Sequence, residues 1–337
     1  MTTDPMTIDR RAVVAGLTAL GLLPVAAHGQ TRRKEVLAFY YGWYATQSRS
    51  DIVLHWPPQS PILDTPADGP YDSLDPAVIQ RHAGQAKAAG LTGLVASWWG
   101  QGDRTDRQLP LLLDACHAQG LKVCAYVEQA GSADSVAKDV LYLHERYAGH
   151  PGWLSLNGKP VVMFFDRLLQ NLGLDGWDQA RKAVEARAPG ALAFIGTAND
   201  EKEIAARREH FDAVHIYSQQ FAVAHPHMFR GLWTRDYYRD WVRAQAGMAA
   251  TTATVLPGFD DHLIEDRTGK RPIVGREDGK TYGDLWLAAV KADPDWIFVV
   301  SFNEWHEGSE IEPSTQYGDA YLKATADYAR AFMNPAS

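Results

Sequence analysis

A hydrophobic run and the turn after it read Val36-Leu37-Ala38-Phe39-Tyr40-Tyr41-Gly42-Trp43-Tyr44. Branched and aromatic residues in such a short run predict a buried β-strand. In a doubly wound α/β sheet, the first strand is normally followed by a glycine-rich turn that binds phosphate. Aromatic residues and a single glycine take that place here. The stretch therefore favours an α/β barrel, with the doubly wound sheet as the alternative.

The same plan recurs along the chain from residue 35 onward, because β-rich runs alternate with amphipathic helical stretches. We predict eight strands, at 36–43, 91–98, 121–128, 160–166, 191–197, 211–217, 252–259 and 296–303. Helices are expected at 75–89, 108–119, 133–147, 176–188, 234–249, 282–292 and 319–333. Eight such units in a chain of 337 residues predict one (β/α)8 TIM barrel spanning residues 31–337.

The first thirty residues have the order of a signal peptide. Asp9-Arg10-Arg11 precedes an uncharged run at 12–27, and small residues follow near Ala26 and Gly29. Paired arginines before a mild hydrophobic run resemble a twin-arginine signal, which predicts export of the folded chain to the periplasm or the medium. An ordinary secretory signal and a short uncleaved anchor are the alternatives.

The charge balance excludes two classes of partner. The chain has 41 acidic and 33 basic residues and a formal charge of -8. Nucleic acid and anionic membrane surfaces are bound by clustered Lys and Arg, so we expect neither. No stretch after residue 30 approaches eighteen apolar residues, and we expect no membrane span in the mature chain.

The two cysteines are predicted to be free thiols. Cys116 falls on a predicted helix and Cys124 in the following strand. Because side chains alternate along a strand, Cys124 shares its face with Tyr126 and Glu128. If Glu128 points into the barrel, Cys124 does too, while the helix lies outside.

A TIM barrel carries its chemistry in the loops after the strands. Two of these loops, 45–73 and 258–280, are long, and we expect both to rim the pocket. The last strand leads into Ser301-Phe302-Asn303-Glu304-Trp305-His306-Glu307-Gly308-Ser309-Glu310-Ile311-Glu312-Pro313. Glu304 and Glu307 are three residues apart, a spacing that places both carboxyls on one side of a turn.

Such a pair suits glycosidic cleavage, which needs one protonated and one ionised carboxyl group. Mutual repulsion and burial separate the two pKa values. The alternative is a solvated helix N-terminus, where acidic residues are common. The strand-end position and the neighbours Asn303, Trp305 and His306 favour the catalytic interpretation.

The stretch Phe302-Asn303-Glu304-Trp305-His306-Glu307-Gly308, with Ile311-Glu312-Pro313, resembles the signature of glycoside hydrolase family 99, the endo-α-1,2-mannosidases and endo-α-1,2-mannanases. Further matches lie at 39–44, 54–56, 97–99, 158–161 and 256–260. The resemblance implies a retaining, endo-acting hydrolase of α-mannosides such as mannan, without metal. It also implies that Glu304 is the base on the substrate 2-hydroxyl, giving a 1,2-anhydro sugar, and that Glu307 is the general acid.

Other residues at strand ends are expected to contact the sugar. For each aromatic residue the alternative is core packing, and for each histidine it is a structural hydrogen bond. The predicted substrate-binding residues are Tyr41, His55, Trp56, Trp98, Trp99, Glu128, Tyr217, Asn303, Trp305 and His306.

We expect no metal or other cofactor. Residue types that can bind a metal occur in His225-Pro226-His227, but the proline restricts how the two histidines can converge on one ion. No zinc-protease or calcium-loop pattern is present.

The expected partner is an oligo- or polysaccharide, bound by a monomer. Residues 129–130, 215–220 and 262–267 depart from the family pattern in loops that would contact neighbouring sugars. Another α-glycan, a role in polysaccharide synthesis and a non-catalytic carbohydrate-binding barrel are therefore alternatives.

Overall fold

The computed structural model describes residues 33–46, 55–217, 219–224, 232–265 and 271–334. The predicted signal peptide at 1–30 and the segment His225-Pro226-His227 lie outside these residues. The described residues belong to one compact unit that spans residues 33–337.

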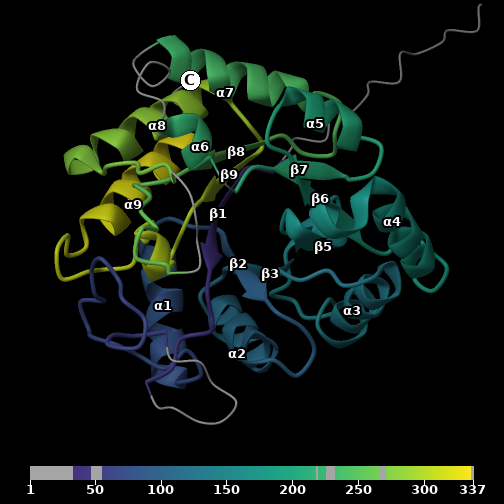
Figure 1. Cartoon of the computed structure of the whole chain (residues 1–337), viewed down its shortest axis with the longest axis horizontal. Helices are drawn as coiled ribbons and strands as arrows, with labels where there is room; N and C mark the ends of the chain where they lie inside the picture. Colours follow the sequence, from purple (N-terminus) through teal and green to yellow (C-terminus); the bar gives the residue numbers. More distant parts are fainter. Residues whose placement is uncertain (1–32, 47–54, 218, 225–231, 266–270, 335–337) are drawn as a thin grey trace, which may run out of the picture. The chain divides into compact units, whose positions relative to one another are not determined.

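Eight parallel strands form the TIM barrel that the sequence predicts (Figure 1). They pair in the order β7-β6-β5-β3-β2-β1-β9-β8, and the two-residue β4, Ser155–Leu156, pairs antiparallel with β5. The barrel strands are β1 Glu35–Tyr40, β2 Gly93–Trp98, β3 Lys122–Val127, β5 Lys159–Phe164, β6 Ala193–Thr197, β7 Ala213–His215, β8 Thr252–Val255 and β9 Trp296–Val299. Each lies inside or within one residue of a predicted strand.

Side chains close the barrel where the backbone ladder is interrupted. Among the described residues, no backbone pairing joins β7 to β8. Thr252 and Thr254 of β8 instead donate their hydroxyls to the carbonyl oxygens of Val214 and Ile216, each at 2.6 Å. Threonine suits this place because its β-branched body fits a strand while its hydroxyl supplies the missing donor.

Aromatic rings fill the barrel below the carboxyl ends of the strands. Phe39 lies at the centre, with its ring centroid 4.8 Å from Tyr126, 5.5 Å from His215 and 5.7 Å from Phe298. Cys124 precedes Tyr126 by two residues and so points into the barrel as well. Both cysteines are buried and free, as the sequence predicts.

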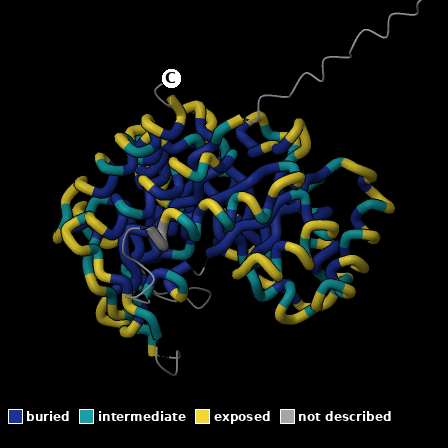
Figure 2. Tube along the Cα trace, turned by 90° about the horizontal axis from the view of Figure 1, so that it is seen from above, coloured by how far each residue is buried: buried dark blue, intermediate teal, exposed yellow. Residues whose placement is uncertain are grey.

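Helices surround the strands, and Figure 2 shows exposed residues along their outer sides and buried residues along the strands. The α-helices are α1 Pro76–Ala88, α2 Arg104–Ala118, α3 Ala133–Arg146, α4 Arg167–Glu185, α5 Glu201–Arg207, α6 Gln220–Val223, α7 Leu232–Ala244, α8 Lys280–Ala292 and α9 Ala320–Met333; 3₁₀ turns are η1 Glu277–Gly279 and η2 Trp305–Glu307. The sequence did not predict α5 and α6, which have seven and four residues.

Helix α4 begins nine residues earlier than predicted. Gly173 interrupts it with φ 64° and ψ -177°, so its first turns and its amphipathic body are separate pieces. The sequence pattern detects only the second piece, because a glycine with positive φ normally ends a helix. The early start matters, since Arg167, three residues after the end of β5, is the first residue of α4 and lies at the site described below.

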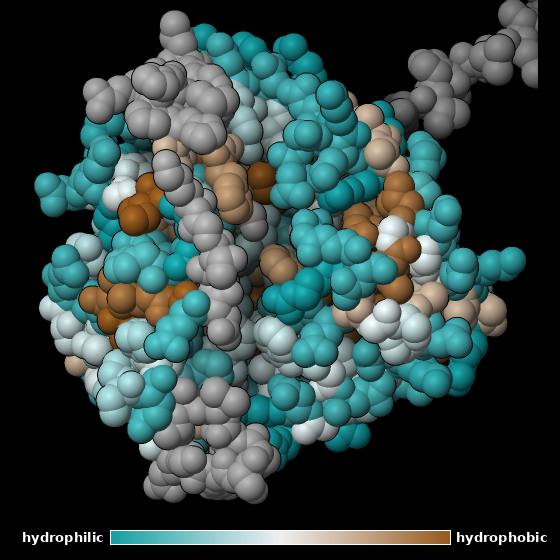
Figure 3. Space-filling model, viewed as in Figure 1, coloured by the Kyte–Doolittle hydropathy of each residue, from teal (hydrophilic) through white to brown (hydrophobic). Residues whose placement is uncertain are grey.

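Within the described residues, no helix combines the length and the apolar character that crossing a bilayer requires. The face drawn in Figure 3 is mostly hydrophilic, with hydrophobic groups in separate small areas.

Candidate active site

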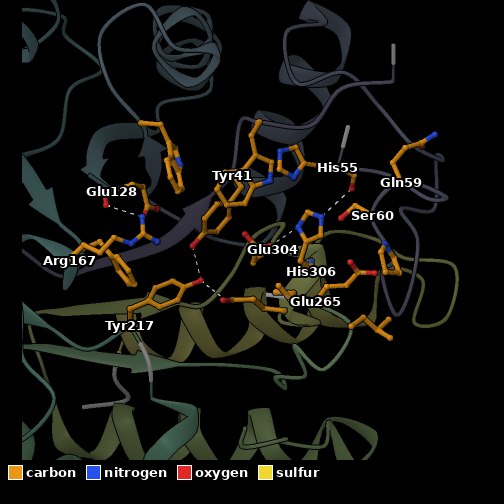
Figure 4. A pocket seen from close by; sticks show the side chains of 17 residues that line it. Tyr41, His55, Gln59, Ser60, Glu128, Arg167, Tyr217, Glu265, Glu304 and His306 are labelled. Carbon is orange, nitrogen blue, oxygen red and sulfur yellow. Dashed lines mark hydrogen bonds and ion pairs between the residues drawn. The ribbon is translucent and has the colours of Figure 1, made fainter. Parts of the chain in front are cut away.

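A pocket of about 380 Å³ opens at the carboxyl ends of the strands (Figure 4). Many of its residues come directly after a strand, as the barrel architecture predicts. Others come from the two long loops, which confirms that both loops rim the pocket. The lining residues are Tyr41, Trp43, His55, Gln59, Ser60, Pro61, Trp99, Glu128, Phe165, Arg167, Tyr217, Leu263, Ile264, Glu265, Glu304, His306 and Glu307.

The loop after β9 is fixed to the first strand. The backbone N–H of Phe302 donates to the carbonyl oxygen of Phe39 at 2.8 Å. Asn303 is fully buried; its side chain accepts from the N–H of Tyr41 at 2.8 Å and donates to the Tyr41 carbonyl at 2.9 Å. Asn303 therefore aligns the turn after β1 with the turn that carries the two glutamates.

A tight turn then presents both glutamates to the pocket. Ser301 Oγ accepts from the backbone N–H of Glu304 at 2.7 Å, and η2 follows immediately. Gly308 ends the turn with φ 56°, a left-handed conformation that glycine adopts without strain. The backbone N–H of Asp260, from the loop after β8, donates to the carbonyl of Glu307 at 2.7 Å. Both glutamates are buried but line the pocket.

Glu304 is paired with a histidine whose two ring nitrogens both face acceptors. His306 Nδ1 lies 3.1 Å from Glu304 Oε1, and Nε2 lies 3.2 Å from the carbonyl oxygen of His55. A carbonyl oxygen only accepts, and so does an ionised carboxylate, so both nitrogens donate only if the ring is an imidazolium. Burial lowers the pKa of His306, but the hydrogen bond and charge of Glu304 raise it more, and the net pKa is above the ordinary value.

Among the described residues, a side-chain hydrogen-bond partner of Glu307 is a phenol. Tyr217 donates its hydroxyl to Glu307 Oε2 at 2.7 Å, and Tyr41 donates to the Tyr217 hydroxyl at 2.7 Å. Burial, followed by the nearby carboxylates, raises the pKa of both phenols well above the ordinary value, so both stay protonated. Within the described residues, the two glutamates thus have different neighbours: Glu304 lies beside a histidine whose pKa is raised, and Glu307 lies beside hydroxyl groups.

A third carboxyl group, Glu128, lies at the end of β3. Ser97 donates to its Oε1 at 2.9 Å, and the Trp99 indole N–H donates to Ser97 Oγ at 3.0 Å. Burial raises the pKa of Glu128 to about 8, although Ser97 and Arg167 oppose the increase. Glu128 is therefore mostly protonated near neutral pH and can donate as well as accept a hydrogen bond.

The pocket brings together the two predicted catalytic glutamates and six predicted substrate-binding residues, namely Tyr41, His55, Trp99, Glu128, Tyr217 and His306. The other four, Trp56, Trp98, Asn303 and Trp305, do not line it and are at most 3% exposed. Each tryptophan donates its indole N–H inside the protein, to Tyr71 O, Asp106 Oδ1 and Glu312 Oε2 respectively. These four residues therefore have structural contacts inside the protein and are not exposed in the pocket.

Sequence reasoning did not single out Trp43, Phe165 or Arg167, which line the pocket. Trp43 is the last residue of the first predicted strand, and its indole stacks on His55 at 5.4 Å between ring centroids. Phe165 lies near the end of the predicted strand 160–166 and Arg167 directly follows it; this position at a strand end was the sequence feature that could have identified them as pocket residues. In the part of the chain that the structure describes, no three Cys, His, Asp or Glu side chains are grouped as metal ligands.

The chain matches the model of the family described as glycosyl hydrolase family 99 over residues 62–330. It is 25% identical over 327 residues to the glycoprotein endo-alpha-1,2-mannosidase of Rattus norvegicus, covering 82% of this chain and 67% of that protein. The Xenopus laevis protein of the same name is 26% identical over 333 residues, with 85% and 71% covered. A solved family 99 endo-alpha-mannosidase from Bacteroides thetaiotaomicron is 28% identical, with a TM-score of 0.76 and 88% and 97% covered.

Proposed function

Because the chain belongs to glycosyl hydrolase family 99 and is a glycosidase, we propose that it is an exported, retaining endo-α-mannosidase that cleaves α-1,2-linked mannosides. The observation that carries the proposal is the pair Glu304 and Glu307 on one turn. They face one pocket, and His306 and Tyr217 give them different environments. General base and general acid catalysis requires such a difference between two carboxyl groups.

In the first step, Glu304 removes the proton of the substrate 2-hydroxyl, and that oxygen attacks the anomeric carbon. Glu307 gives its proton to the glycosidic oxygen as the bond to the leaving sugar breaks. An axial 2-hydroxyl, as in mannose, lies opposite the leaving group, which suits this attack. The product of the step is a 1,2-anhydro sugar.

In the second step, water opens that ring at the anomeric carbon. Glu307 takes the proton of the water, and Glu304 returns its proton to the 2-oxygen. Two inversions give net retention, and both carboxyl groups return to their starting states. The ion pair with His306 suits Glu304 to begin the cycle as an anion.

The layout of the pocket supports cleavage within a chain. Figure 4 places Glu128 and Arg167 on one side of Glu304, and Gln59 and Ser60 on the other. Polar and aromatic groups are thus available to sugars on both sides of the scissile bond. An enzyme that removes single terminal sugars would need one side closed.

The proposal is tested by incubation with a defined manno-oligosaccharide of alternating α-1,3 and α-1,2 links, followed by NMR of the fresh products. We expect release of a fragment longer than one sugar, cut at the α-1,2 link, with the α anomer appearing first. Release of single mannose units or a first-formed β anomer would refute it. Matched α-glucans are the control for another α-glycan as substrate.

We also propose export through the twin-arginine motif at Arg10 and Arg11. Changing both arginines to lysine keeps the charge but removes the motif. In a bacterial host with this export route, the unsubstituted chain should be found in the periplasm or medium and the variant in the cytoplasm, as measured by cell fractionation. Unchanged export of the variant would instead favour an ordinary secretory signal.

A further inference from the structure

Arg167 presents a fixed guanidinium at one end of the pocket. It is the first residue of α4, three residues after the end of β5. Its guanidinium carbon lies 5.1 Å from the ring centroid of Trp99 and 4.9 Å from that of Phe165, and Nη1 donates to the carbonyl oxygen of Glu128 at 3.1 Å. Two aromatic rings and one hydrogen bond therefore hold the group in place.

Most donors of this guanidinium are free for a ligand. An arginine has five N–H donors. Within the described residues, the bond to Glu128 is the one hydrogen bond that Arg167 makes, and no carboxylate oxygen lies within 4.0 Å of its nitrogens. Three other well-shielded arginines are each paired with a carboxylate: Arg104 with Asp72, Arg207 with Glu203 and Arg276 with Glu310.

The carboxyl groups of the pocket do not neutralise Arg167. Glu304 is paired with His306. In the proposed first step, Glu307 carries a proton as the general acid. Glu128 is mostly protonated near neutral pH, because burial raises its pKa to about 8. Glu265 lies on the side of Ser60 in Figure 4, away from Arg167. Within the described residues, the Arg167 end of the pocket thus presents a guanidinium that no carboxylate pairs with, and it has several hydrogen-bond donors.

We propose that the subsite formed by Trp99, Phe165 and Arg167 binds a sugar that carries an oxyanion substituent, a carboxylate or a phosphate ester. The planar fork of arginine binds both groups with two parallel hydrogen bonds. The protonated Glu128 offers one more donor, and the Trp99 ring is available to the apolar face of the sugar. The inference rests on the proposed function and specifies it further: the natural glycan is acidic at this subsite.

The test measures binding to the Glu307→Gln variant, which has a neutral side chain of nearly the same shape at that position and should not turn the glycan over. Calorimetry compares α-linked oligosaccharides that differ in one terminal C6 group, which is a hydroxymethyl, a carboxylate or a phosphate ester. Two series carry the substituent at the reducing or the non-reducing end. We expect an acidic glycan of one series to bind about tenfold tighter or more than the neutral one, since hydrogen bonds between charged groups are strong.

Adding Arg167→Met should remove that preference while changing binding of the neutral glycan less than about threefold, since methionine keeps the packing on the rings. Arg187→Met is the matched control, because it removes the same charge from an arginine whose side chain is 69% exposed. It should keep the preference. If Arg167→Met lowers the melting temperature, Arg167→Gln serves as the second variant.

Equal or weaker binding of every acidic glycan would overturn the proposal. So would a preference that survives both Arg167 variants, or a matching loss of neutral binding in them, which would make Arg167 a general sugar contact. A preference for only one of the two acidic groups identifies the substituent. Hydrolysis of the neutral oligosaccharide by the unsubstituted enzyme reports separately on the proposed function.

Discussion

Glu304→Gln and Glu307→Gln should each lower the turnover of an α-1,2-mannoside about a thousandfold or more. Glutamine has nearly the same shape but neither takes nor gives a proton, and general acid or base groups contribute about 10²–10⁴ in rate. The melting temperature should change little, because a glutamine amide oxygen at either position still accepts the hydrogen bond from His306 or Tyr217. Glu209→Gln, at an exposed residue away from the pocket, is the control and should keep full activity.

The two roles can be separated with a substrate whose leaving group needs no proton, such as an α-mannosyl fluoride. The Glu307→Gln variant should recover much of its rate in forming the anhydro intermediate from the fluoride. The Glu304→Gln variant should not recover, because it cannot activate the 2-hydroxyl. The assignment is wrong if either variant keeps more than about a tenth of the parent turnover on the glycoside, or if the fluoride rescues Glu304→Gln instead.

The barrel could be predicted because its strands are buried on both sides and read as hydrophobic runs. The strand ends could not be placed as well. Residues such as Tyr41 and Phe259 continue the hydrophobic pattern, so the strands predicted at 36–43 and 252–259 extend three and four residues beyond the ends of β1 and β8. Beyond these ends the backbone forms hydrogen bonds with loops instead of with the neighbouring strands, as where Phe259 and Val274 exchange hydrogen bonds. Where the backbone changes from a strand partner to a loop partner depends on the tertiary structure and cannot be read from the sequence pattern.

The neighbouring tryptophans show what the sequence leaves open in the site. In the parallel pair β2 and β3, Ser97 is opposite Tyr126 and Trp98 is opposite Val127. Tyr126 faces the barrel interior, so Ser97 does too, and Trp98 points outward to Asp106 of α2. Trp99, beyond the strand, turns back to Ser97 and the pocket. Residue type alone does not distinguish these two tryptophans, because the register of the barrel decides which one can meet a ligand.

Arg276→Met should lower the free energy of unfolding by about 3–5 kcal/mol, the usual cost of removing one partner from a buried ion pair. Arg276 Nη2 donates to Glu310 Oε1 at 2.6 Å and to the carbonyls of Gly308 and Glu310, at the end of the turn that carries Glu304 and Glu307 and just after it. Gly258 makes room for it, since a Cβ there would lie 2.6 Å from Arg276 Cγ. Methionine keeps contact with the aromatic rings around Arg276 but supplies no donor. Urea unfolding measures the change.

The loss should depend on pH in a direction that identifies the buried carboxyl group as its cause. Burial raises the pKa of Glu310 to about 7, with Arg276 opposing the increase. A raised pKa means that the folded chain holds this proton more tightly, so the stabilisation is complete below the ordinary pKa and is lost as the pH rises through the folded value. Without Arg276 the folded pKa moves above 7, so the two proteins differ in protonation only above about pH 7. The deficit of the variant should therefore be larger at about pH 9 than at about pH 5, with the growth occurring above about pH 7. The double variant Arg276→Met with Glu310→Gln removes the charge, so most of that growth should disappear. A deficit that is equal at both pH values, and unchanged in the double variant, would assign the effect to the lost backbone hydrogen bonds instead.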